Sequence, residues 1–479
     1  MKGRSGRAGR TVRKRKRKRE QSVRSVSLSH QPQYIRLMRF LHRRGFSSTL
    51  LQPVLFSDTG RGLQTLQTIM PGELVVSLPE SCLLTTSTVL SSYLGEYIKS
   101  WKPLLSPLSA LCVFLVCERQ RGEASDWFPY INVLPSSYAC PAYFSDEVVD
   151  VLPAGVRRRG LEQREAVREM HSSNQEFFRT LQPVLSRPTE DVLTYEALRW
   201  AWCSVNTRSV FMSRPSSCFL SGPDTYALAP FLDLLNHRPD VQVKAGFNEQ
   251  TKCYEIRSVC GTLRYEQAFI NYGSHDNQRL LLEYGFVAMN NPHSVVYVEP
   301  DLLCDILRGE KSLDQKMKFL RENHFLENLT VSSEGPSWRL MVALRLLSLP
   351  QTLYHLWRSA LLGQVVDEKT EVRSSQTART LCQQLLKDTH IALDKISQLL
   401  GQCGGPVREQ LEVVRELRQE ERRILESCVT ALKDSVTLEK ETSSCKANVG
   451  ADELTPYRSS VHTAAVSYFF LPTKLLKRH

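Results

Sequence analysis

The residues Asp233-Leu-Leu-Asn236-His237 and Phe269-Ile-Asn-Tyr272-Gly273 decide the fold of this chain. Each stretch places a few polar side chains among apolar ones, and a buried Asn or His must find hydrogen-bond partners. On its own, the first stretch is better explained by a hydrogen-bonded turn than by a site. On its own, the second is explained equally well by a strand packed by core aromatic residues. Their meaning therefore depends on the sequence around them.

Two further motifs accompany this pair. Gly60-Arg61-Gly62-Leu63 stands at the start of a predicted strand, where glycine lets a backbone approach a ligand closely, although a tight turn explains it equally well. Glu283-Tyr284-Gly285-Phe286 follows the apolar residues 280–282, so a predicted helix lies between two Tyr-Gly pairs. Core packing explains the second motif about as well as a site does.

Several familiar chemistries are excluded by what the sequence lacks. It contains neither a P-loop nor a GxGxxG fingerprint. Ser274-His275-Asp276 is not a hydrolase triad, because adjacent residues do not normally form that relay and no nucleophile elbow is present. No second His or Cys lies at ligand spacing from His237, and no CxxC pair occurs, so we expect no metal site.

The charge of the chain is concentrated at its N-terminus. The 479 residues carry a net charge of +12. Residues 1–24 hold twelve Lys or Arg and a single acid, Glu20, which leaves about +1 for the remainder. The unbroken basic run from Arg13 to Arg19 is typical of a nuclear-localisation signal read by importin, of a polyanion-binding arm, or of a solvated tail. Beyond this arm we expect no direct nucleic-acid binding.

The remaining composition favours a reduced, intracellular protein, and with the basic arm we expect it in the nucleus and the cytosol. Apolar residues make up 42% of the chain, enough for a sizeable core. The thirteen cysteines have no regular spacing, so a disulfide framework is not expected. No apolar stretch is long enough to span a bilayer, and no apolar segment follows the basic run as in a secretory signal.

The order of predicted elements is strands, helices, strands and then a helical remainder. Strands are predicted at 54–56, 63–68, 74–78, 241–247, 254–258 and 268–272. Helices are predicted at 34–44, at 104–120 and over most of 160–213, with a break at Pro183 and Pro188. From about residue 300 the pattern is helical and ends in an antiparallel pair that breaks at Gly404-Gly405-Pro406.

Taken together, the motifs resemble the SET domain of protein methyltransferases. Gly-x-Gly comes early, then Asn-His, then a strand that ends in Tyr-Gly. The helical insert and helical C-terminal half resemble the Rubisco large-subunit methyltransferase-like class, over roughly residues 35–440. The resemblance implies an α+β fold: a SET-domain β-fold with a helical insert, followed by an all-α C-terminal domain. The expected parts are a disordered basic tail (1–30), the SET domain (35–300) with its insert (about 104–213), a substrate-binding domain (301–440) and a disordered tail (441–479).

The resemblance also implies a cofactor and a set of site residues. Members of this class bind S-adenosylmethionine, and by similarity the cofactor would contact Gly60, Arg61, Gly62, Leu63, Asn236, His237, Tyr272 and Phe286. Tyr272 would lie beside the transferring methyl and be the catalytic residue. Arg208, Asp233 and Tyr284 would lie near the substrate lysine. The C-terminal helices would help to hold the protein substrate.

The sequence departs from the family pattern at three places. Arg238 follows Asn-His where the family often has Ser. Tyr265-Glu266 stands where a Gly-Glu turn usually precedes the Tyr-Gly strand, and Arg279 stands where an acid often lies. These departures bear on cofactor affinity and turn geometry, whereas Asn236, His237 and Tyr272 match.

The functional hypotheses follow from these observations. The leading one is a protein-lysine N-methyltransferase acting on histone or non-histone proteins, with the acceptor open because a related branch modifies histidine. An inactive SET scaffold that binds chromatin or proteins is the alternative. A nucleic-acid binder that uses residues 1–24 is a third possibility, with little support from the near-neutral body.

Overall fold

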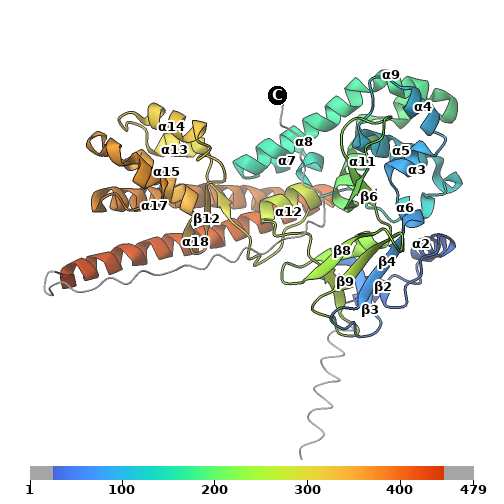
Figure 1. Ribbon diagram of the computed structural model, residues 1–479, viewed down its shortest axis with the longest axis horizontal. Helices are drawn as coiled ribbons and strands as arrows, with labels where there is room; N and C mark the ends of the chain where they lie inside the picture. The colour runs from blue at the N-terminus through green and yellow to red at the C-terminus, as the bar shows by residue number, and fades with distance from the viewer. Residues whose placement is uncertain (1–24, 447–479) are drawn as a thin grey trace, which may run out of the picture. The chain divides into compact units, whose positions relative to one another are not determined.

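The computed structural model describes residues 25–446, and side chains up to residue 433. The basic run at 13–19 and the residues from 447 onward lie outside the described residues. The described chain forms two compact units. The first contains residues 25–138 and 164–274, and the second contains residues 139–163 and 275–446. Figure 1 shows the elements of each unit.

The first unit is built on three small sheets. A five-stranded sheet has the order β1-β2-β3-β10-β7, a three-stranded sheet the order β4-β9-β8, and β5 pairs with β6. The strands are β1 (Ser25–Ser27), β2 (Leu51–Phe56), β3 (Gly60–Thr65), β4 (Leu74–Pro79), β5 (Ser209–Arg214), β6 (Asp224–Leu228), β7 (Asn236–His237), β8 (Val243–Asn248), β9 (Cys253–Ser258) and β10 (Gln267–Ile270). Short strands distributed over several sheets bring loops from distant parts of the sequence together.

Two pairings in the five-stranded sheet position the sequence motifs. β2 and β3 form a hairpin in which Phe56 pairs with Gly60, and Gly60 takes a φ of 70° that favours glycine. β10 pairs antiparallel with β3 and parallel with β7. The whole helical insert lies between β3 and β7 in the chain. The sheet therefore brings together residues that precede the insert and residues that follow it.

Helices surround these sheets in the first unit. They are α2 (Pro32–Arg43), α3 (Thr86–Leu90), α4 (Gly95–Ser100), α5 (Pro107–Arg121), α6 (Phe128–Ile131), the C-terminal half of α8 (Ala154–Ser173), α9 (Gln175–Thr180), α10 (Thr189–Val192) and α11 (Tyr195–Arg208), with short 3₁₀ turns such as η5 (Leu232–Leu234). α5 begins with Pro107 after the N-cap Ser106, whose side chain accepts from the Ser109 N–H. Twelve of its 15 residues are buried, so α5 is a core helix.

The second unit is mainly helical. Its helices are α7 (Asp146–Val149), α12 (Asn277–Tyr284), α13 (Pro300–Ile306), α14 (Leu313–Glu322), α15 (Trp338–Ser348), α16 (Trp357–Leu361), α17 (Glu368–Leu400) and α18 (Gly405–Lys446), with the 3₁₀ turns η3 (Pro141–Tyr143) and η6 (Gln351–Leu356). α17 and α18 are antiparallel, since a short turn joins them and the Cys382 and Cys428 sulfurs lie 3.7 Å apart across the pair. The predicted helical pair is therefore confirmed.

The structure corrects four details of the predicted elements. Residues 209–213 belong to β5 and not to a helix, because α11 ends at Arg208. β10 ends at Ile270, so Tyr272 follows the strand. The expected all-α C-terminal part contains a small sheet of β11 (Val296–Tyr297), β12 (Thr330–Ser332) and β13 (Gly335–Pro336), whose strands are too short to produce a sequence pattern. Finally, β1 falls inside the predicted N-terminal tail.

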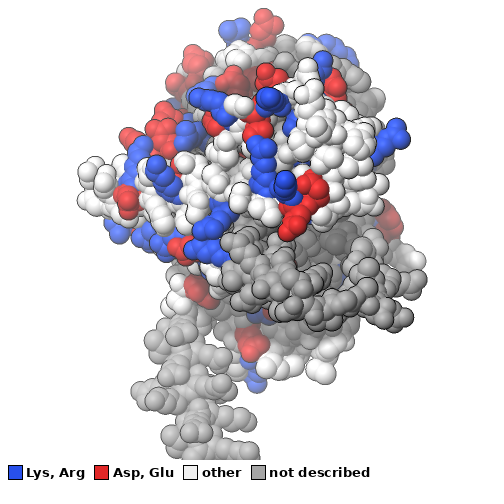
Figure 2. Space-filling view, turned by 90° about the vertical axis from the view of Figure 1, so that its left-hand side faces the viewer, with Lys and Arg blue, Asp and Glu red and all other residues white. Residues whose placement is uncertain are grey.

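The surface of the described chain is mixed in charge. Figure 2 shows Lys and Arg interspersed with Asp and Glu on the face that it presents. Within residues 25–446 no helix is long and apolar enough to cross a membrane. No cluster of three or more metal-ligating side chains occurs among the described residues. The twelve cysteines whose side chains are described, Cys82 to Cys428, are free thiols.

Candidate active site

The centre of the candidate site is the parallel pairing of β7 with β10. Phe269 pairs with Asn236 and Ile270 with His237, so the Asn-His motif lies beside the strand that leads to Tyr272. The Tyr272 backbone N–H donates to Nδ1 of His237 over 3.0 Å. The two rings lie 5.1 Å apart between centroids. The two stretches that decide the fold therefore meet in the first unit.

Asn236 connects this pair to the β2–β3 hairpin. Its side-chain Nδ2 donates to the Arg61 carbonyl oxygen over 3.0 Å. A Cβ atom on Gly62 would lie 2.9 Å from the same Nδ2 and 2.4 Å from Nε2 of Gln267, closer than real Cβ contacts. A side chain at residue 62 would therefore force the Gln267 and Asn236 amides to move, so close packing, and not a turn, favours glycine there.

A buried polar cluster lies next to the residues that lead into β7. Nη1 of Arg208 donates to the Asp233 carbonyl oxygen over 2.8 Å and lies 3.9 Å from its carboxylate. The Tyr130 hydroxyl donates to the same carboxylate over 3.0 Å. Burial raises the pKa of Asp233, although Arg208 and the Tyr130 hydrogen bond act to lower it. For Arg208, burial acts to lower the pKa, but Asp233 and the neighbouring tyrosines raise it overall, so the guanidinium stays charged.

The Tyr272 hydroxyl is held in its neutral form. It donates to the Leu235 carbonyl oxygen over 2.6 Å. Burial raises the pKa of Tyr272 well above the usual range, with Arg208 opposing and Asp233 adding to the shift. Because the hydroxyl donates its proton to a carbonyl oxygen, the phenolic oxygen can still accept a hydrogen bond from another group.

The site residues that the sequence predicted divide between the two units. The first unit contains nine of them: Gly60, Arg61, Gly62, Leu63, Arg208, Asp233, Asn236, His237 and Tyr272. Tyr284 and Phe286 belong to the second unit, where the Tyr284 ring stacks on His275 at 5.9 Å and lies 6.3 Å from the Phe286 ring. These two residues keep their predicted roles as proposals.

Two residues that contact the candidate site were not identified from the sequence. Tyr130, on α6, holds the Asp233 carboxylate. Gln267 accepts from the Thr59 hydroxyl over 2.9 Å and packs on Gly62. Neither residue belongs to a motif, and only the folded chain brings them to the hairpin. No signal in the sequence could have identified them.

The departures from the family pattern have local explanations. Arg238 is exposed and pairs with Asp240 at 2.8 Å, and Arg279 pairs with Glu283 on α12 at 3.0 Å. Both added charges are therefore balanced by neighbouring acids. Tyr265 takes a φ of 69°, the left-handed conformation that glycine favours. The turn therefore holds a non-glycine residue in a strained backbone conformation.

Structural comparison defines the class of the fold. The chain matches the SET domain of LSMT bound to lysine and AdoHcy with a TM-score of 0.57 and 20% identity, over 86% of this chain and 93% of that one. It matches Rubisco LSMT bound to AdoMet with a TM-score of 0.56 and 18% identity, over 88% and 97%. A family model described as Rubisco LSMT substrate-binding matches residues 308–425. The fold is therefore the predicted α+β SET-domain fold with a mainly helical C-terminal region.

Sequence comparison gives the particular family. SET domain-containing protein 4 of Mus musculus is 47% identical over 89% of this chain and 98% of its own length. The protein of that name from Homo sapiens is 44% identical over 88% and 97%. The chain belongs to the SET domain-containing protein 4 family. A more distant match is the actin-histidine N-methyltransferase of Homo sapiens, 29% identical over 55% of this chain and 44% of that protein.

Proposed function

We propose that this chain is an S-adenosylmethionine-dependent protein-lysine N-methyltransferase. The observation that carries the proposal is the pairing of β7 with β10, which places Asn236, His237 and Tyr272 beside the Gly60–Leu63 hairpin strand. Membership in a SET-domain family and the fold shared with LSMT support the class of reaction. The matched LSMT domain is bound to AdoHcy and lysine, which supports both the cofactor and the acceptor.

The residues present fit the cofactor. The β3–β10 pairing covers only Leu63 and Gln64, so at Gly60 and Arg61 β3 is paired with β2 on one edge and has no strand along the other. Asn236 uses its Nδ2 on the Arg61 carbonyl, so its Oδ1 can accept from the ammonium of an amino acid. A Cβ at Gly60 would meet nothing within 4 Å, so the backbone there is open to a ligand. S-Adenosylmethionine supplies, when bound, a methyl group on a sulfonium that a neutral amine can displace in line.

The residues of this chain act by holding and orienting the acceptor. Deprotonating a free lysine at pH 7 costs about 4.6 kcal/mol, so a desolvated site that disfavours the ammonium lowers the barrier. The Tyr272 oxygen, with its own proton committed to Leu235, can accept from the amine and orient its lone pair. No side chain is required as a dedicated base, and most of the gain comes from alignment.

The remaining roles follow the same reasoning. Arg208 and Asp233 would form the wall near the acceptor, and the second unit, which carries the substrate-binding match, would hold the protein substrate. Histone and non-histone proteins are the substrates we propose, in the nucleus and cytosol, with import through the run from Arg13 to Arg19. Tyr284 would help to form the substrate channel and Phe286 would pack on the adenine.

Calorimetry with the full chain tests the cofactor site first. We expect micromolar binding of S-adenosylmethionine that weakens at least tenfold in Asn236→Ala, because the variant loses both the acceptor and the contact with Arg61. Asn248→Ala is the matched control, since Asn248 also donates its amide to one partner, Glu255, at 3.2 Å. A folded chain that does not bind the cofactor would overturn the proposal.

Methyl transfer from labelled cofactor tests the reaction and its acceptor. We expect label on histone or non-histone peptides that contain lysine, loss of transfer in Tyr272→Phe, and retention in the matched variant Tyr297→Phe, which also loses one hydroxyl hydrogen bond. Label only on a histidine-containing peptide would show that the acceptor assignment is wrong. Cofactor binding with no transfer to any peptide would favour the inactive scaffold.

A further inference from the structure

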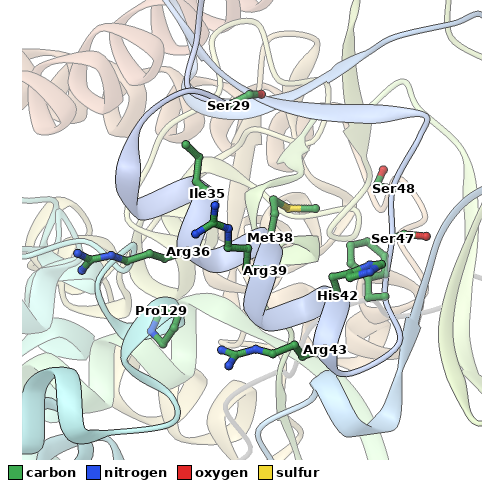
Figure 3. A pocket seen from close by; sticks show the side chains of 11 residues that line it. Ser29, Ile35, Arg36, Met38, Arg39, His42, Arg43, Ser47, Ser48 and Pro129 are labelled. Atoms are coloured by element: carbon green, nitrogen blue, oxygen red, sulfur yellow. The ribbon is translucent and has the colours of Figure 1, made fainter.

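A cavity of about 790 Å³ runs along the exposed face of α2 in the first unit. Figure 3 shows Arg36, Arg39 and Arg43 along this face, with Ser47 on the chain that returns beside the helix. The buried face of α2, which includes Leu37 and Phe40, anchors the helix in the core. The cavity is thus formed by a rigid element, and it shares no residue with the candidate active site.

Two of the three arginines of this cavity have no acidic partner among the described residues. Arg36 pairs with Glu123 at 2.9 Å. Arg39 and Arg43 form no ion pair within 4.0 Å among the residues that the structure describes, although they are exposed and one helical turn apart. Like charges at this spacing repel each other and destabilise a helix. The sequence from residue 21 to residue 57 contains no Asp or Glu at all, so nothing local offsets this charge.

Apolar side chains lie between the charged ones. Ile35 and Met38 are half-buried and line the cavity between the arginines. Methionine adapts its shape to varied apolar partners. Phe46 also lines the cavity but is only 3% exposed, so it offers no face for a nucleic-acid base to stack on. The combination therefore favours a peptide over a nucleic acid.

We propose that the α2 cavity docks an acidic segment of a partner protein. Carboxylates of that segment bind the guanidinium groups of Arg39 and Arg43, which suit planar, bidentate acceptors. An apolar side chain of the same segment packs on Ile35 and Met38. The proposal concerns a docking surface and does not rest on the methyltransferase activity proposed above.

Fluorescence anisotropy with the full chain tests this docking surface. The probes are a labelled peptide of repeated Glu-Glu-Leu, a second of repeated Glu-Glu-Ser, and an oligothymidylate of equal formal charge. We expect the double variant Arg39→Gln with Arg43→Gln to weaken binding of the leucine peptide about tenfold. The matched control, Lys244→Gln with Arg264→Gln, removes two other exposed cations of the first unit and is expected to leave binding unchanged.

A preference for the leucine peptide distinguishes binding at this cavity from binding at residues 1–24. The positive charge of residues 1–24 attracts any anion, whether or not it contains leucine. We expect the chain to bind the Glu-Glu-Leu peptide several-fold more tightly than the Glu-Glu-Ser peptide, and Met38→Ser to remove that preference. Equal binding of the leucine peptide by both double variants would overturn the proposal. So would the absence of a leucine preference, or tighter oligothymidylate binding that is lost in the Arg39 and Arg43 variant.

Discussion

The backbone N–H of Tyr272 donates to Nδ1 of His237 over 3.0 Å, just beyond the end of the β7–β10 pairing. Since Nδ1 accepts, a neutral His237 carries its proton on Nε2. The hydrogen bond extends the contact between the two segments to the second residue after the end of β10. His237 thereby fixes the backbone from which the Tyr272 ring projects.

Replacing His237 tests this positioning. His237→Phe keeps a planar ring but removes the acceptor, which leaves a partly buried N–H without a partner. We expect the free energy of unfolding to fall by about 1–3 kcal/mol, measured by urea denaturation. His30→Phe, at an exposed histidine, is the control and should change little. Unchanged stability in His237→Phe would show that the contact with Tyr272 is dispensable.

The substitution Gly62→Ala is a second test, which depends on steric packing rather than on a hydrogen bond. A Cβ there would lie 2.4 Å from the Gln267 amide and 2.9 Å from the Asn236 amide. We expect Gly62→Ala to lower the free energy of unfolding by about 1–3 kcal/mol and to weaken cofactor binding, because the Asn236 side chain must move. Gly246→Ala is the control, since nothing lies within 4 Å of its Cβ. Equal effects of the two substitutions would contradict the packing argument.

A substitution at Tyr265 is expected to raise the free energy of unfolding, whereas the two substitutions above are expected to lower it. It holds a φ of 69°, which costs a non-glycine residue about 1–2 kcal/mol. Its side chain is 47% exposed, so little packing is lost on truncation. We expect Tyr265→Gly to raise the free energy of unfolding by up to about 1 kcal/mol, after the entropy that glycine costs. Tyr265→Ala removes the same ring without relieving the backbone, and should give no gain.

These cases show what the sequence could and could not predict. Local patterns were sufficient for α2, for the β2–β3 hairpin and for the α17–α18 pair, because each depends on near neighbours in the chain. The pairing of β7 with β10 could not be read from periodicity, since β7 is only two residues long. The resemblance to a SET domain predicted only that Asn236, His237 and Tyr272 belong to one site.

The remainder of the site depends on long-range contacts. Tyr130 reaches Asp233 from more than a hundred positions earlier in the chain, and no motif marks it. The small β11–β12–β13 sheet was missed because its strands are two or three residues long. The division of Tyr272 and Tyr284 between two units is likewise a property of the folded chain, since they lie close in sequence.

The pH dependence of stability has a contribution from a buried thiol. Cys82 is fully buried, and burial raises its pKa to about 11, with Ser81 and Arg44 opposing. An unfolded thiol has a pKa near about 8.5. Between these values the unfolded chain loses a proton that the folded chain keeps, so the free energy of unfolding falls as the pH rises. We expect Cys82→Ala to flatten this decline in urea titrations from about pH 8.5 to about 11. Cys218→Ala, at an exposed thiol, should leave the slope unchanged.

The pairing of Arg208 with Asp233 is best tested by a double-mutant cycle. Arg208→Met leaves the buried Asp233 carboxylate without its guanidinium, although the Tyr130 hydroxyl still donates to it, and we expect a loss of about 3–5 kcal/mol in the free energy of unfolding. Asp233→Leu alone removes the carboxylate but keeps the hydrogen bond from Arg208 to the carbonyl oxygen of residue 233, and should also lower the free energy of unfolding. The double variant removes both charges, so it should be more stable than the sum of the single losses predicts. Additive losses would show that the two groups do not depend on each other, and that the pair does not stabilise the wall beside Tyr272.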